Sequence, residues 1–411
     1  MKIKDITTKI GSGATPTGGE NAYKESGIAL IRSQNVLDFS FSNHGLAYID
    51  EVQAQKLDGV TVKKGDVLLN ITGDSIARCC MAPEEFLPAR VNQHVAIIRS
   101  KDVSSEYLMY YLQYMKPYLL QICGVGGTRN ALTKESIENI PFFKQENEEK
   151  IAAVLSDIDA KIANNAICAD LEGMAKLLYD YWFVQFDFPD ENGKPYKSSG
   201  GKMVWNEELK REIPEEWEAK SLKSLATIQT ESISPFEKKD SIFEHYSIPA
   251  FDDGRYPVFE TGSEIDSNKY RVPHAAILVS KLNPQFKRIW DPLNTDETCI
   301  CSTEFMPFVC RNNLLRGYVY FLLNSDAFQK YLVQCSSSST GSRKRMQPEL
   351  CGDFLLAIPE SSCLMEQFSK IVIPMLEDSK NRITENAELT SLRDFLLPML
   401  MNGQVKVKEG A

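Results

Sequence analysis

Basic side chains recur on two glycine-containing loops of this chain of 411 residues. The first loop, GVGGTRNALT, carries Arg129, and the second, SSSSTGSRKRMQPE, carries Arg343, Lys344 and Arg345. Arginine and lysine on a loop with accessible backbone suit contact with phosphate groups. A solvated turn is the commoner meaning of a single basic cluster, but recurrence at corresponding places favours a pair of phosphate-binding loops.

Side chains able to read base edges occur near the ends of predicted strands in both halves of the chain. Arginine, asparagine, glutamine and lysine match the hydrogen-bonding edges of bases in the major groove. The candidates are Arg32, Gln34 and Asn35 in the first half, and Lys281, Asn283 and Arg288 in the second. We expect cations to position DNA through its phosphates and these side chains to discriminate its bases.

The fragment Asn283-Pro284-Gln285-Phe286 invites an enzymatic interpretation. It differs by one residue from the N-P-P-[FYW] loop with which amino-group DNA methyltransferases hold their target base. The cofactor-binding half of such an enzyme is missing from this chain. We therefore favour the simpler interpretation, a turn that follows a strand.

Two further fragments are weak candidates for catalysis. The run Gly124-Val125-Gly126-Gly127 follows a helical stretch rather than a strand and lacks an acidic residue at the expected distance, which argues against a phosphate cradle. Glu148-Glu149-Lys150 could form half of a nuclease E-x-K motif, but acidic residues are also typical of the start of a helix. Without a catalytic constellation, we predict that the chain is not an enzyme.

Histidine and cysteine spacing gives no sign of a metal site. His44, His94, His245 and His274 are scattered, and none of the ten cysteines forms a CxxC pair. The amino terminus lacks the apolar core of a signal peptide, and no run approaches the roughly 18 apolar residues needed to span a membrane. We expect a cytoplasmic protein with reduced thiols, no metal and no cofactor of its own.

Two long helical segments are the elements that must position these candidates. Apolar residues recur at three- and four-residue steps in residues 146–185 and again in 363–403, and a shift of 221 positions aligns the two stripes. The predicted helix-pairing residues are Ile151, Leu155, Ile158, Ile162 and Asn165 in the first segment, and Val372, Leu376, Ile383, Asn386 and Leu392 in the second. The matched asparagines would either fix the register of the pair or remain solvated. Pro374 predicts that the straight part of the second helix starts at or just after it.

The order of a β-rich half, a helical stretch and a glycine loop also occurs twice. This predicts a mixed α/β (α+β) tandem repeat, in which two domains are each followed by a long helix and the two helices pair through their apolar stripes. The predicted segments are a first domain at 1–145, a helix at 146–185, a linker at 186–213, a second domain at 214–362, a helix at 363–403 and a tail at 404–411.

The net charge of −10 argues at first against a nucleic-acid partner. The excess of acid is concentrated in the first helix and the linker, because residues 146–218 hold 17 acidic and 8 basic side chains. The two flanking domains are nearly balanced, so each retains the capacity for a basic face.

At this point the chain resembles the DNA-specificity subunits of type I restriction-modification enzymes. The motifs in the first half are GDVLLNITGDSIARC, VNQHVAII and GGTRNAL. Those in the second half are YSIPAFDDGRYPVF, ILVSKLNPQFKRIW and LRDFLLPMLMNGQV. The resemblance covers essentially the whole chain, and the order of its motifs is more specific than any one of them.

The resemblance implies that each domain is a target recognition domain for one half of a bipartite, asymmetric double-stranded DNA sequence. It also implies that the two helices pair as an antiparallel coiled coil, set the gap between half-sites and dock two methyltransferase subunits, and that the complex recruits restriction subunits. S-adenosylmethionine, ATP and magnesium would then belong to the partner subunits. The alternatives are a stand-alone DNA methyltransferase or nuclease, or a coiled-coil adaptor that binds only proteins.

Overall fold

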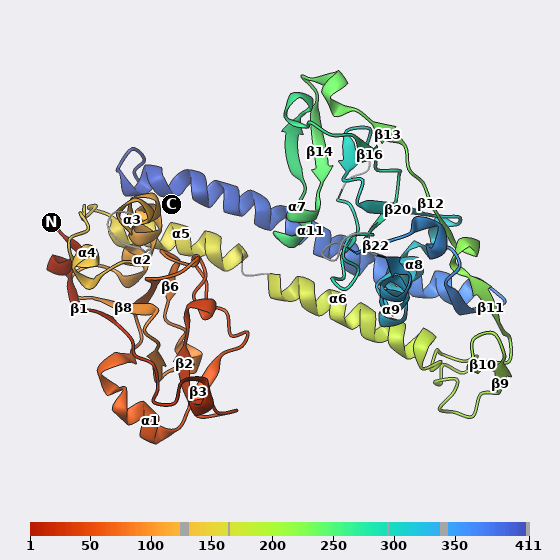
Figure 1. Cartoon of the computed structure of the whole chain (residues 1–411), viewed down its shortest axis with the longest axis horizontal. Helices are drawn as coiled ribbons and strands as arrows, with labels where there is room; N and C mark the ends of the chain where they lie inside the picture. The colour runs from red at the N-terminus through yellow and green to blue at the C-terminus, as the bar shows by residue number, and fades with distance from the viewer. Residues whose placement is uncertain (124–130, 163–164, 294–295, 338–343, 408–411) are drawn as a thin grey trace. The chain divides into compact units, whose positions relative to one another are not determined.

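The computed structural model describes residues 1–123, 131–162, 165–293, 296–337 and 344–407. The chain forms two compact units (Figure 1). Unit 1 comprises Met1–Ala163 and Glu388–Ala411, and unit 2 comprises Asn164–Ala387.

Unit 1 is built on two four-stranded sheets. The antiparallel sheet has the order β1-β8-β5-β6, with bounds Thr7–Ser12, Val95–Ser100, Asp66–Asn70 and Cys79–Met81. The mixed sheet has the order β3-β2-β7-β4, with bounds Ala47–Ile49, Ile28–Ile31, Ala89–Val91 and Thr61–Val62. In the mixed sheet β2 and β7 are parallel.

The central strand β5 is buried on both faces, which explains its nearly continuous apolar run. Val67 and Leu69 pack into one core cluster with the buried residues of helix α2, whereas Leu68 packs into a second cluster with strands β2 and β7. This alternation follows from the two-residue repeat of a strand. It places β5 between a helical layer and the second sheet.

The helices of unit 1 cover this core and include the first long segment. They are α1 (Glu51–Lys56), α2 (Ser105–Tyr114), α3 (Lys116–Cys123), α4 (Lys134–Glu138) and α5 (Glu148–Ile162). Ser104 caps α2 by accepting a hydrogen bond from the backbone of Tyr107. The buried tyrosines of α2 pack in the same core cluster as Ile151 and Leu155 of α5.

Unit 2 has the same strand order. Its antiparallel sheet is β12-β20-β17-β18, with bounds Ala226–Ile228, Phe305–Cys310, Ile277–Ser280 and Ile289–Trp290. Its mixed sheet is β13-β16-β19-β14-β15, with bounds Ser232–Ile233, Lys269–Arg271, Cys299–Cys301, Ile242–Tyr246 and Val258–Thr261. When the strands of the two units are matched in chain order, each strand of unit 1 has a counterpart in unit 2, which has β13 in addition. The parallel pair β14–β19 of unit 2 corresponds to the parallel pair β2–β7 of unit 1.

The remaining elements of unit 2 are helices and short strand pairs. The helices are α6 (Asn165–Tyr179), α7 (Ile248–Asp252), α8 (Arg316–Leu323), α9 (Asp326–Gln334), α10 (Pro348–Cys351) and α11 (Cys363–Met401), whose last residues belong to unit 1. The strand pairs are β9–β10 (Met203–Asn206, Arg211–Pro214), β11–β23 (Trp217–Ser221, Leu355–Pro359) and β21–β22 (Ser336–Ser337, Arg345–Met346).

Three details of the helices and the linker differ from the sequence-based prediction. The first long segment is described as α5 and α6, followed by a π-helical turn at Asp180–Val184, with residues 163–164 outside the described range. The helix α11 already begins at Cys363, before Pro374. Proline has no amide hydrogen, so Pro374 leaves the carbonyl of Lys370 without its usual helical donor. Both residues are exposed, so water can donate to that carbonyl instead. The predicted linker contains the β9–β10 hairpin rather than irregular chain alone.

Candidate nucleic-acid interface

A tight turn joins β17 to β18 in unit 2 and presents three predicted base-reading residues, Lys281, Asn283 and Arg288. The backbone amide of Ser280 donates to the carbonyl of Arg288 across 3.0 Å, and that of Phe286 donates to the carbonyl of Asn283 across 2.9 Å. Asn283 has a φ of 48°, in the left-handed region that asparagine tolerates better than most residues. The fragment Asn283–Phe286 is therefore a turn after a strand, as the simpler interpretation predicted.

The same turn is joined to the segment that carries the predicted phosphate contacts. Leu282 forms a β-bridge with Arg345, and the backbone amide of Asn283 donates to the carbonyl of Lys344 across 2.8 Å. In return the backbone amide of Lys344 donates to Oδ1 of Asn283 across 3.1 Å. The structure thus brings the two sets of candidates of the second half together, except Arg343, which lies outside the described residues.

Two of these cations are already held by carboxylates. Arg288 donates to both oxygens of Asp252, across 2.7 and 2.8 Å, and this hydrogen bonding lowers the pKa of Asp252. Arg345 donates to Glu304 across 2.7 Å, which raises the pKa of Arg345. Lys344, in contrast, is exposed and forms no side-chain ion pair within the described part of the chain.

An exposed aromatic ring completes this surface. Phe286 is 56% exposed, and the guanidinium carbon of Arg288 lies 5.3 Å from its ring centroid. An apolar side chain of this kind can contact the methyl group of thymine or stack on an unpaired base. The turn from Lys281 to Arg288, with Lys344 and Arg345, therefore offers positive charge, a polar amide and an apolar tip, and we call it the β17–β18 surface.

Unit 1 contains the corresponding turn between β5 and β6. The backbone amide of Asn70 donates to the carbonyl of Arg78 across 2.8 Å, and that of Ile76 donates to the carbonyl of Gly73 across 3.1 Å. Gly73, with a φ of 75°, takes the place of Asn283. Thr72 forms a β-bridge with Ala131, the residue that follows the undescribed loop carrying Arg129. A β-bridge from the corresponding residue of the turn, Thr72 or Leu282, is therefore present in both units.

The alignment of the two turns identifies residues that the sequence analysis missed. Arg78 occupies the place of Arg288, and it is half-buried with no side-chain hydrogen bond or ion pair to the residues described. Next to this turn, Oγ1 of Thr72 lies 2.6 Å from Nδ1 of His94. The matching sequences NITGDSIARC and SKLNPQFKRI could have revealed Arg78, because the arginine is the eighth residue after the strand-terminal residue in each.

The first-half base candidates follow β2 and are less accessible. Asn35 is completely buried, and its amide nitrogen donates to the carbonyls of Ser42 and His44 across 2.9 and 3.3 Å. This burial counts against its predicted role as a base reader, because the amide nitrogen that would contact a base is bonded to two carbonyls of the turn. Arg32 donates to the carbonyl of Gly45 across 2.5 Å, and only Gln34 is exposed.

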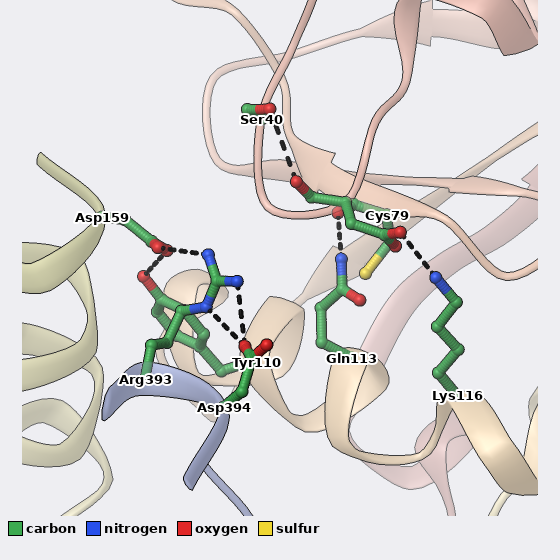
Figure 2. A network of polar contacts seen from close by, with 9 residues as sticks. Ser40, Cys79, Tyr110, Gln113, Lys116, Asp159, Arg393 and Asp394 are labelled. Atoms are coloured by element: carbon green, nitrogen blue, oxygen red, sulfur yellow. Dashed lines mark hydrogen bonds and ion pairs between the residues drawn. The ribbon is translucent and has the colours of Figure 1, made fainter. Parts of the chain in front are cut away.

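A polar network ties the β5–β6 region to the helices of unit 1 (Figure 2). The amide nitrogen of Gln113 in α2 donates to the carbonyl of Cys79 across 2.7 Å, and the ammonium group of Lys116 lies 2.6 Å from Asp38. The hydroxyl of Tyr110 donates to Asp159 of α5 across 2.6 Å, and burial raises the pKa of this tyrosine. The turn that carries Arg78 is thus attached to a packed helical base.

The predicted helix-pairing residues are mostly buried. Ile151, Leu155, Ile158, Val372, Leu376 and Asn386 are buried, whereas Ile162 and Ile383 are half-buried. The side chain of Asn165 lies outside the described residues. Leu392 is 45% exposed, and its neighbour Arg393 is buried instead. The sequence-based register is therefore displaced by one residue at this point, because the buried stripe of α11 there continues through Arg393 and Leu397.

Comparisons with known proteins show which proteins this chain is similar to. Residues 1–172 match the family model of the type I restriction modification DNA specificity domain. The type I restriction enzyme MjaIX specificity subunit of Methanocaldococcus jannaschii is 26% identical over 426 residues, covering 99% of this chain and 93% of the relative. The type I restriction enzyme HindI specificity subunit of Haemophilus influenzae is 22% identical over 452 residues, covering 94% and 95%.

A solved structure supports the fold. The crystal structure of the type I restriction-modification system S subunit from M. genitalium superimposes with a TM-score of 0.59 at 16% identity, covering 99% of this chain and 96% of that one. The curated relatives described above are both specificity subunits of type I restriction enzymes. Residues 1–172 thus contain the type I restriction modification DNA specificity domain, and the whole chain is similar to specificity subunits, in keeping with the resemblance found in its motifs.

Two structural searches complete the description of the site. No group of three or more histidine, cysteine, aspartate or glutamate side chains within the described ranges could hold a metal ion. None of the helices described is both long enough and apolar enough to cross a membrane.

Proposed function

We propose that this chain is the cytoplasmic specificity subunit of a type I restriction-modification complex and that each unit reads one half of a bipartite, asymmetric DNA sequence. The observation that carries the proposal is the recurrence of one turn in both units, at β5–β6 and β17–β18. Each turn forms a β-bridge to a later segment, Thr72 with Ala131 and Leu282 with Arg345, and each ends in an arginine, Arg78 or Arg288. Paired half-site readers use equivalent elements in this way.

The two surfaces present different side chains, which supports an asymmetric target. The β17–β18 surface carries Asn283, Phe286 and Lys287. The corresponding positions of unit 1 are Gly73, Ile76 and Ala77, and the side chains of Ile76 and Ala77 are buried, so the described turn of unit 1 presents none of these groups. Basic residues would position DNA through its phosphates, and the turn residues would select bases. Different donors and apolar groups on a shared framework imply two different half-site sequences.

The helices would pair antiparallel as a coiled coil and set the gap between the half-sites. Within unit 1, Asp159 of α5 contacts Arg393 of α11, and Gln145 contacts the carbonyl of Met401. Within unit 2, Cys168 of α6 contacts the carbonyl of Ser379 in α11. Within unit 1, the residue later in the chain, Asp159, meets the earlier residue of α11, Arg393, whereas Gln145 meets Met401, which supports antiparallel pairing.

The partners follow from the same proposal. The helical region would dock two methyltransferase subunits, and restriction subunits would join the assembly on DNA. S-adenosylmethionine, ATP and magnesium would be held by these partners, in keeping with a subunit that acts only in recognition.

The test is to co-express this chain with the methyltransferase encoded beside it and map methylated adenines by single-molecule sequencing. The proposal expects a two-part motif with a fixed gap. Adding four residues to each long helix should widen the gap by one to two base pairs, because a turn rises about 5.4 Å and a base pair about 3.4 Å. The same insertion in the β9–β10 turn is the control and should leave the gap unchanged. An unchanged gap after the helix insertions would refute the spacer role.

A further inference from the structure

An aromatic cleft lies in unit 2, away from the β17–β18 surface, where the end of the linker meets the start of α11. Its volume is about 630 Å³, and its lining includes Phe188, Tyr196, Trp217, Pro359 and Leu364. The rings of Phe188 and Tyr196 are stacked with centroids 4.7 Å apart, and those of Phe188 and Trp217 with centroids 5.4 Å apart. The cleft therefore offers a continuous apolar wall.

The wall is fixed in place by its surroundings. A side chain on Gly201 would lie 2.5 Å from the ring of Tyr196, so only glycine allows this ring to pack as it does. The hydroxyl of Tyr196 also donates to the carbonyl of Lys202 across 3.0 Å. Trp217 is held in β11, which pairs with β23 at Pro359. Such a site would need little rearrangement to bind a partner.

The rim of the cleft is acidic. Glu191, Glu216 and Glu360 line it and are exposed, and none forms a side-chain ion pair with a described residue. No lysine, arginine or histidine is among the lining residues. Glu216 and Glu360 are adjacent, since the backbone amide of Glu360 donates to the carbonyl of Glu216 across 3.0 Å.

This combination selects the chemistry of the occupant. The negative charge of the rim disfavours DNA binding in the cleft, because the phosphates of DNA would face carboxylates that no described side chain neutralises. Arginine fits both features, since its guanidinium group stacks on aromatic rings and pairs with carboxylates in a bidentate fashion. A protein segment that carries arginine would therefore match the aromatic wall and the acidic rim together.

We propose that this cleft docks an arginine-containing segment of a methyltransferase subunit. The inference rests on the proposed function, and it adds a defined contact surface outside the paired helices. The cleft would hold the methyltransferase at the linker end of unit 2, leaving the β17–β18 surface of the same unit to contact DNA.

Purified complex provides the test. The Glu216→Lys/Glu360→Lys variant should bind the methyltransferase subunit at least about tenfold more weakly than the unaltered chain, and binding by the unaltered chain should weaken as salt rises. The matched control is Glu208→Lys/Glu212→Lys, which makes the same change in charge at two exposed residues of the β9–β10 hairpin outside the cleft. It should bind normally. Thermal unfolding of each variant verifies that the fold is kept.

Cys363 gives a second readout that needs no substitution. It is the exposed cysteine among the ten and lies in the lining of the cleft. Its reaction with a maleimide should slow severalfold when the methyltransferase binds. Equal binding by both variants, equal weakening of both, or unchanged labelling of Cys363 in the complex would overturn the inference. Failure of the unaltered chain to bind the methyltransferase at all would instead refute the proposed function.

Discussion

Arg393 of α11 donates a hydrogen bond to Asp159 of α5 across 2.9 Å, and Asp159 also accepts the hydroxyl of Tyr110 (Figure 2). The guanidinium carbon of Arg393 lies 3.7 Å from the ring centroid of Phe39, a residue held at a φ of 63°. Arg393 therefore contacts the loop after β2 directly and α5 through Asp159, which in turn is bonded to Tyr110 of α2. It would therefore position the recognition elements that we propose for that unit.

Arg393→Leu should destabilise unit 1 by about 3 kcal/mol, because it leaves the mostly buried carboxylate of Asp159 without its cation. The side chains of Arg393 and Asp159 are only 10% and 19% exposed. Hydrogen exchange should become faster in α2 and α5. Arg382→Leu is the control, since Arg382 pairs with Asp378 on the more exposed side of the same helix and should have no measurable effect. Equal effects of the two substitutions would contradict this role.

Arg78→Gln and Arg288→Gln should each relax only one half of the recognised sequence. The two arginines end corresponding turns, so each should discriminate bases in its own half-site by about 1 to 3 kcal/mol. Methylation motifs of the two variants provide the measurement. If both substitutions altered the same half, or if both only weakened methylation uniformly, the assignment of one turn to each half-site would be wrong.

Lys344→Ala should weaken DNA binding without changing the preferred sequence. Lys344 is exposed and is expected to neutralise a phosphate, so the slope of log affinity against log salt should fall by about 1. Binding of the purified complex at several salt concentrations measures this slope. A change in the methylated motif would show instead that Lys344 reads bases.

Asp252→Asn should have the opposite effect on the same slope. Asp252 now neutralises Arg288 through two hydrogen bonds, and the amide would leave the arginine charge available to DNA. Affinity at low salt should therefore rise, with a steeper salt dependence. Unchanged affinity and slope would mean that Arg288 does not face DNA.

Acidification should destabilise unit 2 through His245. Burial lowers the pKa of His245 although Glu260 lies 2.6 Å away, and Nε2 of the ring is buried without a partner. At pH values between the lowered pKa of folded His245 and its usual pKa of about 6.5, the unfolded chain binds a proton on this histidine more readily than the folded chain does. His245 therefore leaves the free energy of unfolding of unit 2 unaffected above about pH 6.5 and lowers it as the pH falls below that value.

All four tryptophans belong to unit 2, so their fluorescence reports its unfolding. The urea midpoint of the unaltered chain should fall more between pH 7.5 and pH 5.5, two assay values that span the usual pKa of about 6.5, than that of His245→Gln. His274→Gln, at an exposed histidine of the same unit, is the control and should behave like the unaltered chain. Identical pH dependence in all three proteins would rule out His245 as the sensor.

The sequence predicted the features that depend on local periodicity. Burial of Ile151, Leu155, Val372 and Leu376 follows from a stripe repeating every three to four residues, which is visible in any helical sequence. The mixed α/β content and the family resemblance were likewise accessible, because motifs occur in a fixed order along the chain.

Features set by tertiary contacts could not be predicted in this way. Asn35 is buried because the chain folds back after it and brings the carbonyls of residues 42 and 44 onto its amide. The residue types at the end of a strand do not predict the course of the following chain. Arg393 replaces Leu392 in the buried stripe because Asp159 pairs with its positive charge and the ring of Phe39 packs against its guanidinium group. The pairing of the turn at Asn283 with Lys344 joins residues distant in sequence, which periodicity cannot show.

The central claim is that each unit reads its own half of one DNA sequence. Its most direct test exchanges residues 1–145 for the corresponding domain of another specificity subunit and maps methylated adenines in cells that contain the cognate methyltransferase. The account predicts a motif in which one half changes to that of the donor, while the other half and the gap stay the same. A change in both halves, or in neither, would contradict it.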